Sequence, residues 1–174
     1  LYLKLSDGYE DGTVYGYYNI PKLFGLQDTG SMESSGILQL RENPDLKLDG
    51  SGVLIGFVDT GIDYAGSIFL KQDGTTRVTA IWDQTIPAGS PIKLPAQPEL
   101  PETPENITRT PEGFLYGSEF THEQLNAAVK MADAYEGISS RDENGHGTFL
   151  ASIAVGNELP DGSFTGAAPK ADIA

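Results

Sequence analysis

The stretch VLIGFVD, residues 53–59, limits the fold of this chain more than any other feature. It is apolar almost throughout and contains β-branched residues, which is typical of a strand buried on both faces of a parallel sheet. Gly50 and Gly52 bracket a turn before it, and Asp59 closes it. We therefore expect a central parallel strand over residues 53–58, with Asp59 at its carboxyl end, where functional groups of open α/β sheets gather.

Further elements alternate between strand and helix along the chain. Thr121 and Gln124 have the spacing of a capping box at the start of a helix, and His146 opens a small-residue helix that reaches about Gly156. This alternation predicts an α/β fold with a parallel sheet. The other expected elements are a short strand within 1–12, an extended arm over 13–28, a helix over 31–43 stopped by Pro44, a strand over 77–82, the capped helix over 121–135 and a strand at the end of the chain.

Residues 84–113 differ in kind, because they hold seven of the 11 prolines in the chain. Each proline removes a backbone donor and restricts the residue before it, so regular structure is excluded over most of this length. We expect an irregular, largely solvent-exposed insertion. Because it separates Asp59 from His146 in sequence, we expect it to lie near the rim of any cleft that these two residues share.

The composition excludes several classes of function. With 11 Lys and Arg against 25 Asp and Glu, the net charge of −14 disfavours a general nucleic-acid or anionic-membrane surface. The absence of cysteine excludes thiol chemistry, zinc–thiolate sites and disulfides. No apolar run approaches the roughly 20 residues that span a bilayer. The chain starts at Leu1 without a signal-peptide pattern, and we interpret it as a piece of a longer polypeptide.

Two short motifs carry candidate chemistry. In FVDTGID, Asp59 ends the apolar strand and the chain turns away from it; in GHGT, His146 stands between two glycines at the start of a helix. Each has a plain structural interpretation by itself, as a turn aspartate and as an exposed histidine at a helix start. A catalytic histidine, in contrast, needs space for a substrate and a fixed tautomer.

Together the motifs are far more specific. DTGID after an apolar strand, then DxxGHGT opening a small-residue helix, then GAAPKA resembles the subtilisin-like serine proteases, whose triad can run in the order Asp, His, Ser. Within that family, YGYYNIPKLFGLQD, DGTTRVTAIWDQT and YGSEFTHEQLNAA are most similar to the clostridial spore-germination proteases. The resemblance implies a three-layer α/β fold with a central parallel sheet. Residues 21–174 would form the N-terminal portion of that catalytic domain, and residues 1–20 an arm or the tail of a prodomain.

The resemblance also implies roles for individual residues. Asp59 and His146 correspond to the catalytic aspartate and histidine. Asp142 corresponds to a substrate-binding position beside the cleft, and Asp63 to a structural aspartate. In such a triad His146 takes the proton of a serine hydroxyl, while Asp59 holds the imidazole tautomer and stabilises the imidazolium.

The nucleophile of the family is missing from these 174 residues. It lies in a GTSxA motif that opens a later helix, and the oxyanion-hole asparagine and main specificity pocket also belong to later sequence. The chain is therefore predicted to be inactive alone, with the remainder of the catalytic domain as its partner and a peptide or protein as the substrate. Where the family has HGTHVAG, this chain has HGTFLAS; the changes at Phe149 and Ser152 leave the proposed chemistry intact. Turn or cap roles are expected for Ser51, Ser67, Ser118, Ser139, Ser140 and Ser163.

Three other interpretations stay open. DTG after an apolar strand is also the aspartic-protease signature, with a homodimer supplying the second copy. A pseudoprotease that binds a partner through its cleft would keep the same fold, and the serine outside this chain decides between it and an enzyme. A metal site has little support, because His122 and His146 are the only imidazoles and neither HExxH nor a calcium-loop motif is present.

Three smaller expectations complete the prediction. His122, in the first turn of its helix, is expected to face solvent. No cofactor is expected; structural calcium is common in the family but cannot be read from this sequence. The resemblance further implies an extracytoplasmic location, secreted or spore-associated.

Overall fold

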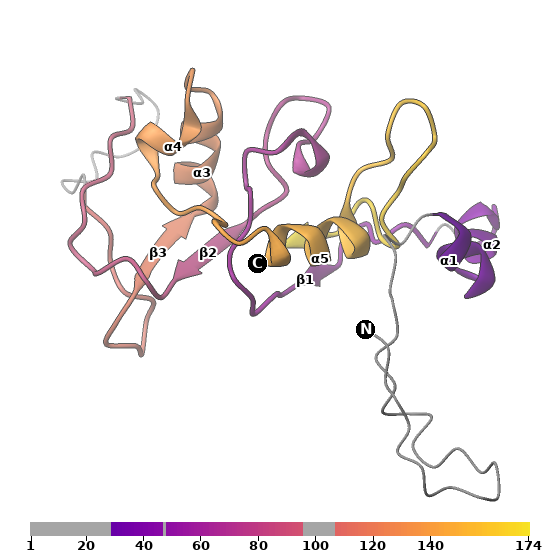
Figure 1. The fold of residues 1–174 in the computed structure, drawn as a ribbon, viewed down its shortest axis with the longest axis horizontal. Coiled ribbons are helices and arrows are strands. Elements are labelled where there is room, and N and C mark those ends of the chain that lie inside the picture. The colour runs from indigo at the N-terminus through magenta and orange to yellow at the C-terminus, as the bar shows by residue number, and fades with distance from the viewer. Residues whose placement is uncertain (1–28, 47, 96–106) are drawn as a thin grey trace, which may run out of the picture.

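The computed structural model describes residues 29–46, 48–95 and 107–174 (Figure 1). The strand expected within 1–12, the arm over 13–28 and the proposed arm or prodomain tail over 1–20 lie outside these residues. The described elements, in chain order, are α1 (Thr29–Ser34), α2 (Ile37–Glu42), β1 (Leu54–Ile55), the 3₁₀ helix η2 (Ser67–Phe69), β2 (Ala80–Asp83), β3 (Ser118–Thr121), α3 (His122–Val129), α4 (Ala134–Gly137), α5 (His146–Val155) and β4 (Asp172–Ile173).

The described strands form a small parallel sheet and a separate antiparallel pair. β1 and β4 run parallel, with Leu54 opposite Asp172 and Ile55 opposite Ile173. On the other side of β4, Val78 forms a parallel bridge with Ile173, so β4 lies between β1 and the segment that leads into β2. β2 and β3 pair antiparallel. The expected α/β class is confirmed as a mixed arrangement, and the strand expected over 77–82 is shifted to β2 with an antiparallel partner.

The prediction of a strand over residues 53–58 buried on both faces is wrong in two respects. β1 covers only Leu54–Ile55, and the burial of the apolar run is one-sided. Ile55 and Phe57 pack against the core, whereas Leu54 is 60% and Val58 97% exposed. Side chains along extended backbone alternate between faces, and within the described part of the chain only one of these faces is covered.

A glycine breaks the helix that was expected over residues 31–43. Gly36 has a φ of +80°, a left-handed conformation that interrupts a right-handed helix, so the chain forms α1 and α2 instead. Arg41 on α2 donates hydrogen bonds to Thr165 Oγ1 at 3.0 Å and to the carbonyl oxygen of Gly166 at 3.2 Å. These bonds tie α2 to the loop that precedes β4.

The helix expected over 121–135 is likewise divided in two. The capping box is confirmed, since Thr121 accepts from the N–H of Gln124 and the Gln124 side chain accepts from the N–H of Thr121. α3 nevertheless ends at Val129, and Asp133 begins α4 by accepting a hydrogen bond from the N–H of Tyr135. Aspartate side chains offer the backbone such alternatives to a continuous helix, which explains the break.

The proline-rich stretch over 84–113 is irregular wherever it is described. Its described parts, 84–95 and 107–113, contain no helix or strand element and are mostly exposed, although Ile92 and Thr108 are buried. Isolated bridges join Pro91 to Ile107 and Arg109 to Glu119 of β3. The prediction of irregular structure is confirmed for these parts, and residues 96–106 lie outside the described residues.

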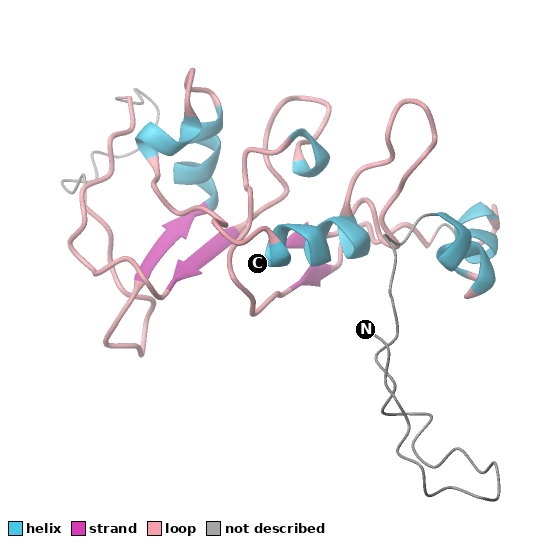
Figure 2. Cartoon of the chain, in the orientation of Figure 1, coloured by secondary structure: helices cyan, strands magenta, loops and turns pink. Residues whose placement is uncertain are grey.

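Helices cover the strands in both halves of the described chain. Figure 2 shows α3 and α4 beside the β2–β3 pair, and α5 passes in front of β1 in this view, with Ala151 and Val155 of α5 in the same apolar cluster as Ile55 of β1. The inner faces of these elements share one apolar cluster, whose almost fully buried members are Tyr64, Phe69, Val78, Phe120, Leu125, Ala128, Ile138, Ala151, Val155, Ala171 and Ile173. α5 is therefore held by packing along its length as well as by contacts at its ends.

A buried arginine joins the C-terminal end of α5 to its surroundings. Arg77 is only 3% exposed, and its Nη1 donates to the carbonyl oxygen of Ala171 at 2.7 Å. Its Nη2 donates to the carbonyl oxygen of Val155, the last residue of α5, and to Asn157 Oδ1 at 3.0 Å. A cation is favoured at a helix C-terminus because the last carbonyl groups carry partial negative charge. Arg77 thus ties the end of α5 to the residue before β4.

Removing this side chain is expected to destabilise the protein strongly. Arg77→Ala leaves the buried carbonyl groups of Ala171 and Val155 without a donor, each costing about 1–3 kcal/mol. We expect the free energy of unfolding to fall by about 3 kcal/mol or more, measured by urea denaturation. Lys170→Ala is the control, because its exposed ion pair with Asp49 at 2.6 Å contributes little. Equal losses in the two variants would contradict the anchoring role of Arg77.

Candidate active site

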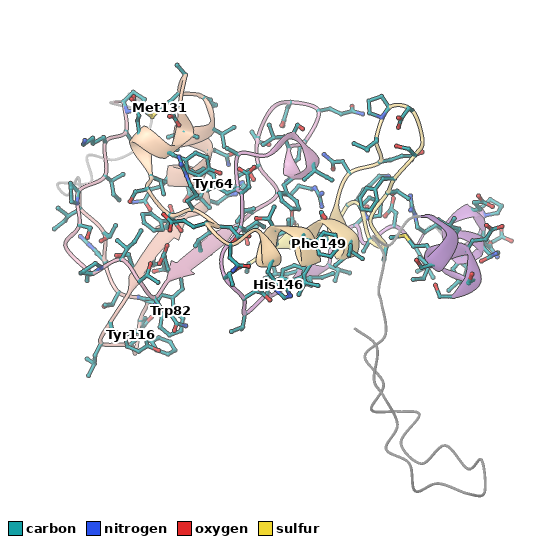
Figure 3. All side chains as sticks on the ribbon, in the orientation of Figure 1. Tyr64, Trp82, Tyr116, Met131, His146 and Phe149 are labelled. Atoms are coloured by element: carbon teal, nitrogen blue, oxygen red, sulfur yellow. The ribbon has the colours of Figure 1, made fainter. Side chains whose placement is uncertain are left out.

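The two candidate catalytic side chains contact each other directly. His146 Nδ1 lies 2.7 Å from Asp59 Oδ1, although the two residues are 87 positions apart. Asp59 follows β1, and His146 is the first residue of α5, as Figure 3 shows with Phe149 further along the same helix. The structure therefore brings together the pair that the two motifs predict.

The hydrogen bond to Asp59 defines the tautomer of His146. A carboxylate only accepts hydrogen bonds, so Nδ1 carries the proton and donates it to Asp59. Nε2 of the neutral ring is then an acceptor, and no group in the described part of the chain is bonded to it. The His146 side chain is 56% exposed, whereas that of Asp59 is 16% exposed. The ring thus presents a basic nitrogen to solvent while its other nitrogen is held.

Asp59 is kept in its ionised form. Its Oδ1 accepts the hydrogen bond from His146 and a second one from the backbone N–H of Thr60 at 2.8 Å. These two bonds, that from His146 foremost, hold the pKa of Asp59 below its usual value. An ionised carboxylate beside the ring can stabilise an imidazolium when the ring takes up a second proton.

Two glycines allow α5 to approach the segment after β1. Gly147 is buried, and a Cβ atom on it would overlap the carbonyl oxygen of Gly61 and lie 3.2 Å from the Cβ of Asp59. Gly61 has a φ of +133°, and a Cβ there would lie 3.1 Å from the Cα of Asp142. Because side chains do not fit at either position, these glycines determine how closely His146 can approach Asp59.

Asp142 is bonded to the protein at both carboxylate oxygens. Oδ1 accepts from the N–H of Gly145 and the hydroxyl of Thr60, each at 2.8 Å, and Oδ2 accepts from the N–H of Thr148 at 2.8 Å. Partial burial opposes ionisation, but the hydrogen bonds from Thr148, Gly145 and Thr60 outweigh it and hold the pKa of Asp142 well below its usual range. Substrate binding by Asp142 stays a prediction.

Asp63 joins three segments around the pair. Its Oδ1 accepts a hydrogen bond from the hydroxyl of Tyr135 on α4, and its backbone N–H donates to Thr148 Oγ1 at 2.9 Å. Arg141 lies over the ring of Tyr135, 4.2 Å from the ring centroid. These contacts agree with the structural role expected for Asp63.

The expectation that His122 faces solvent is wrong. Its Nδ1 lies 3.0 Å from the carbonyl oxygen of Val78, and its Nε2 lies 2.9 Å from Asn126 Nδ2. Asn126 Oδ1 in turn accepts from the N–H of Thr76 at 2.8 Å. The helix start at Thr121 follows β3 directly, so the ring of His122 packs toward the neighbouring extended segment instead of pointing outward.

Of the serines singled out in the sequence, Ser51 and Ser163 have the expected turn contacts. The expectation is wrong for Ser118, which is buried within β3, and for Ser140, which is buried and bonds to a distant aspartate. Four of the serine hydroxyls have defined partners: that of Ser51 bonds to Asp49, Ser118 to Thr108 and two carbonyl oxygens, Ser140 to Asp83, and Ser163 to Asp161. In the described ranges, no group of three or more His, Asp or Glu side chains is arranged to hold a metal ion. None of the helices described there is long and apolar enough to cross a membrane.

Sequence reasoning overlooked two residues of the site. Thr60 contacts Asp59, Asp142 and the start of α5, and its signal was available, since it is the residue next to Asp59 in DTG. Tyr135 was interpreted only as part of an apolar helix stripe. Its partner Asp63 is 72 positions away, and no local pattern predicts that contact.

Most of the chain is similar to known proteins. Residues 50–174 match the family model described as the Subtilase family. The chain is 29% identical over 141 residues to the subtilisin-like protease SBT3.8 of Arabidopsis thaliana and 30% identical over 132 residues to SBT2.2 of the same plant. Among solved structures, the CspB protease of Clostridium perfringens is similar, with a TM-score of 0.59 and 29% identity.

The matched part is a small share of each relative. The alignments cover 72% and 71% of this chain but only 16% and 14% of the two plant proteases. The structural match covers 83% of this chain and 24% of the CspB chain. The likeness therefore concerns the segment that carries the Asp59–His146 pair, within much longer proteins.

Adding one methyl group at Gly147 is expected to disrupt the pair. In Gly147→Ala the Cβ would overlap the carbonyl oxygen of Gly61, so α5 must shift and the distance from His146 Nδ1 to Asp59 Oδ1 must increase. The proton resonance of His146 Nδ1, which lies far downfield while shared with a carboxylate, is expected to move upfield in NMR spectra.

Gly74→Ala is the control for this substitution. Gly74 also has a positive φ, of +80°, but a Cβ there meets nothing within 4 Å. The variant is expected to be slightly less stable and to retain the downfield resonance. A Gly147→Ala protein with an unshifted resonance would contradict the importance of the glycine contact.

Proposed function

Because this chain belongs to the Subtilase family, we propose that it is the N-terminal part of the catalytic domain of a serine endopeptidase with an Asp–His–Ser triad. The observation that carries the proposal is the hydrogen bond of 2.7 Å between His146 Nδ1 and Asp59 Oδ1. It leaves Nε2 available as a base, as activation of a serine hydroxyl requires. The serine itself comes from sequence outside these 174 residues.

In the proposed reaction His146 acts first as a base and then as an acid. Its Nε2 removes the proton of the serine hydroxyl while the serine oxygen bonds to the carbonyl carbon of the scissile peptide, whose oxygen takes the electron pair. When the tetrahedral intermediate collapses, Nε2 gives the proton to the leaving amine and the C–N bond breaks. Water then attacks the acyl-serine by the same route. Asp59 stabilises the imidazolium throughout without becoming protonated.

The remainder of the catalytic domain is the proposed partner of β1. The backbone groups of Val53, Ile55 and Phe57 bond to those of Asp172 and Ala174, so the alternate residues direct theirs to the opposite edge. Among the described residues no strand pairs with that edge, and one face of the same run exposes the side chains of Leu54 and Val58. Unpaired edges with apolar side chains favour addition of another strand. The larger parallel sheet of a three-layer fold would pair the open edge of β1, and its additional layer would cover the side chains of Leu54 and Val58.

The other parts of the proposal rest on the family resemblance. The substrate is a peptide or protein, and the location is extracytoplasmic, either secreted or spore-associated. Residues 1–20 are proposed as an arm or prodomain tail, 21–174 as the N-terminal portion of the catalytic domain, and 84–113 as an insertion. Membership of the Subtilase family speaks against the aspartic-protease alternative, which also offers no reason for His146 to bind Asp59.

Substitution of the pair is expected to affect turnover far more than binding. In the full-length protease, Asp59→Asn is expected to lower kcat by about 10⁴ with KM nearly unchanged, because the imidazole tautomer is lost. His146→Ala is expected to cost at least as much. Glu143→Gln, a change at an exposed neighbouring carboxylate, is the control and should retain wild-type kcat.

Inhibitors separate the alternatives in the same experiment. A serine-directed fluorophosphonate is expected to label the wild-type protease, and pepstatin is expected to leave it active. A protein that binds peptides without labelling or turnover would instead be a pseudoprotease, and inhibition by pepstatin would revive the aspartic-protease interpretation.

The 174-residue chain alone is expected to lack peptidase activity. It carries neither the nucleophile nor the oxyanion donors, and those donors and substrate binding supply the residual rate of triad-deficient proteases. Because of the open edge of β1, the isolated chain is also expected to associate or to need a partner segment. Peptide cleavage by the purified chain, abolished by His146→Ala, would show that a nucleophile lies within it.

A further inference from the structure

The first turn of α5 has no cap from the residue that precedes it. Gly145 has no side chain to accept a hydrogen bond, and its φ of +83° is left-handed. The first four N–H groups of a helix have no partner within the helix, so they need acceptors from elsewhere. These groups lie beside His146, which occupies the first position of the same helix.

Two side chains outside the helix supply acceptors for two of these N–H groups. Asp142 Oδ2 accepts from the N–H of Thr148 at 2.8 Å, and Thr60 Oγ1 accepts from the N–H of Gly147 at 3.0 Å. Asp142 comes from the loop before α5, whereas Thr60 is 87 positions away from Gly147. The helix that begins with His146 is therefore capped in part by the residue next to Asp59.

The hydroxyl of Thr60 has a defined direction. A carboxylate only accepts, so the Thr60 O–H donates to Asp142 Oδ1 at 2.8 Å and Oγ1 keeps its lone pairs for the N–H of Gly147. The backbone N–H of Thr60 donates to Asp59 Oδ1, the oxygen that also binds His146. Thr60 thus contacts the carboxylate of the pair with its backbone and the neighbour of the histidine with its side chain.

We propose that Thr60 is a positioning residue which, oriented by Asp142, holds the ring of His146 against Asp59. The inference rests on the proposed function and deepens it. Thr60 acts through Gly147, the residue next to His146, without contacting a reacting atom. Asp142 then serves to orient Thr60 and to cap α5, in place of the substrate contact expected from the sequence.

The test compares Thr60→Val with Thr60→Ser in the full-length protease. Valine keeps the shape of threonine but has no hydroxyl, so Gly147 loses its acceptor; serine preserves both hydrogen bonds. In Thr60→Val, kcat is expected to fall about 10- to 100-fold with KM nearly unchanged, because a displaced base slows the chemical step without weakening binding. Thr60→Ser is expected to restore kcat to near the wild-type value.

Thr79→Val is the matched control. The Thr79 hydroxyl donates to the carbonyl oxygen of Ile173 at 2.8 Å, so this change also removes a bonded hydroxyl, but from the sheet. Its kcat is expected to stay at the wild-type value. A second readout is the downfield proton resonance of His146 Nδ1, which should shift upfield in Thr60→Val and remain in the other two variants.

Asp142→Asn separates positioning from substrate binding, and it carries the test should Thr60→Val fail to fold. Either orientation of the amide replaces one acceptor oxygen by a donor, facing either the N–H of Thr148 or the hydroxyl of Thr60. We expect a lower kcat with little change in KM. An increase in KM at constant kcat would mean that Asp142 contacts substrate, and it would overturn the positioning role of this carboxylate.

The remaining outcomes are equally decisive. The proposal is overturned if Thr60→Val keeps both the wild-type kcat and the unshifted resonance, or if Thr79→Val loses as much kcat. Failure of the proposed function can be distinguished from failure of this inference. The resonance of His146 Nδ1 reports the hydrogen bond to Asp59 whether or not the protein has peptidase activity. Loss of the resonance in Thr60→Val, but not in Thr60→Ser, then supports positioning of the pair by itself.

Discussion

The contact of Gly147 with the carbonyl oxygen of Gly61 is the constraint on which the rest of the site depends. It allows α5 to lie against the segment that follows β1, where no larger side chain fits. Only at that separation can His146 Nδ1 come within 2.7 Å of Asp59 Oδ1. Hydrogen bonds are short-ranged and directional, so a shift of an ångström would forfeit the pairing and with it the fixed tautomer.

α5 is anchored at both ends by side chains from elsewhere in the chain. At its start, Asp142 and Thr60 accept from the N–H groups of the first turn. At its end, the buried guanidinium of Arg77 donates to the last carbonyl group and to the residue before β4. The partial charges of a helix favour this distribution, with an anion at the N-terminus and a cation at the C-terminus. Anchors at both ends fix the direction in which α5 presents the ring of His146.

The apolar run around β1 has one face that the described residues leave uncovered. Ile55 and Phe57 pack inward, while Leu54 and Val58 expose large apolar surfaces. An isolated domain rarely leaves a strand with so much exposed apolar surface. The relatives that match this chain are several times longer, which agrees with a role for further sequence in covering that face.

The sequence by itself predicted the pair of side chains on which the proposed chemistry rests. The types of residue in DTG and HGT, after an apolar run and before a small-residue helix, are local signals, and they identified Asp59 and His146. Tertiary structure alone decided the length and one-sided burial of β1 and the capping of α5 by Thr60. These features depend on contacts between segments more than 80 positions apart, such as that of Thr60 with Asp142, and the periodicity of a short segment carries no information about them.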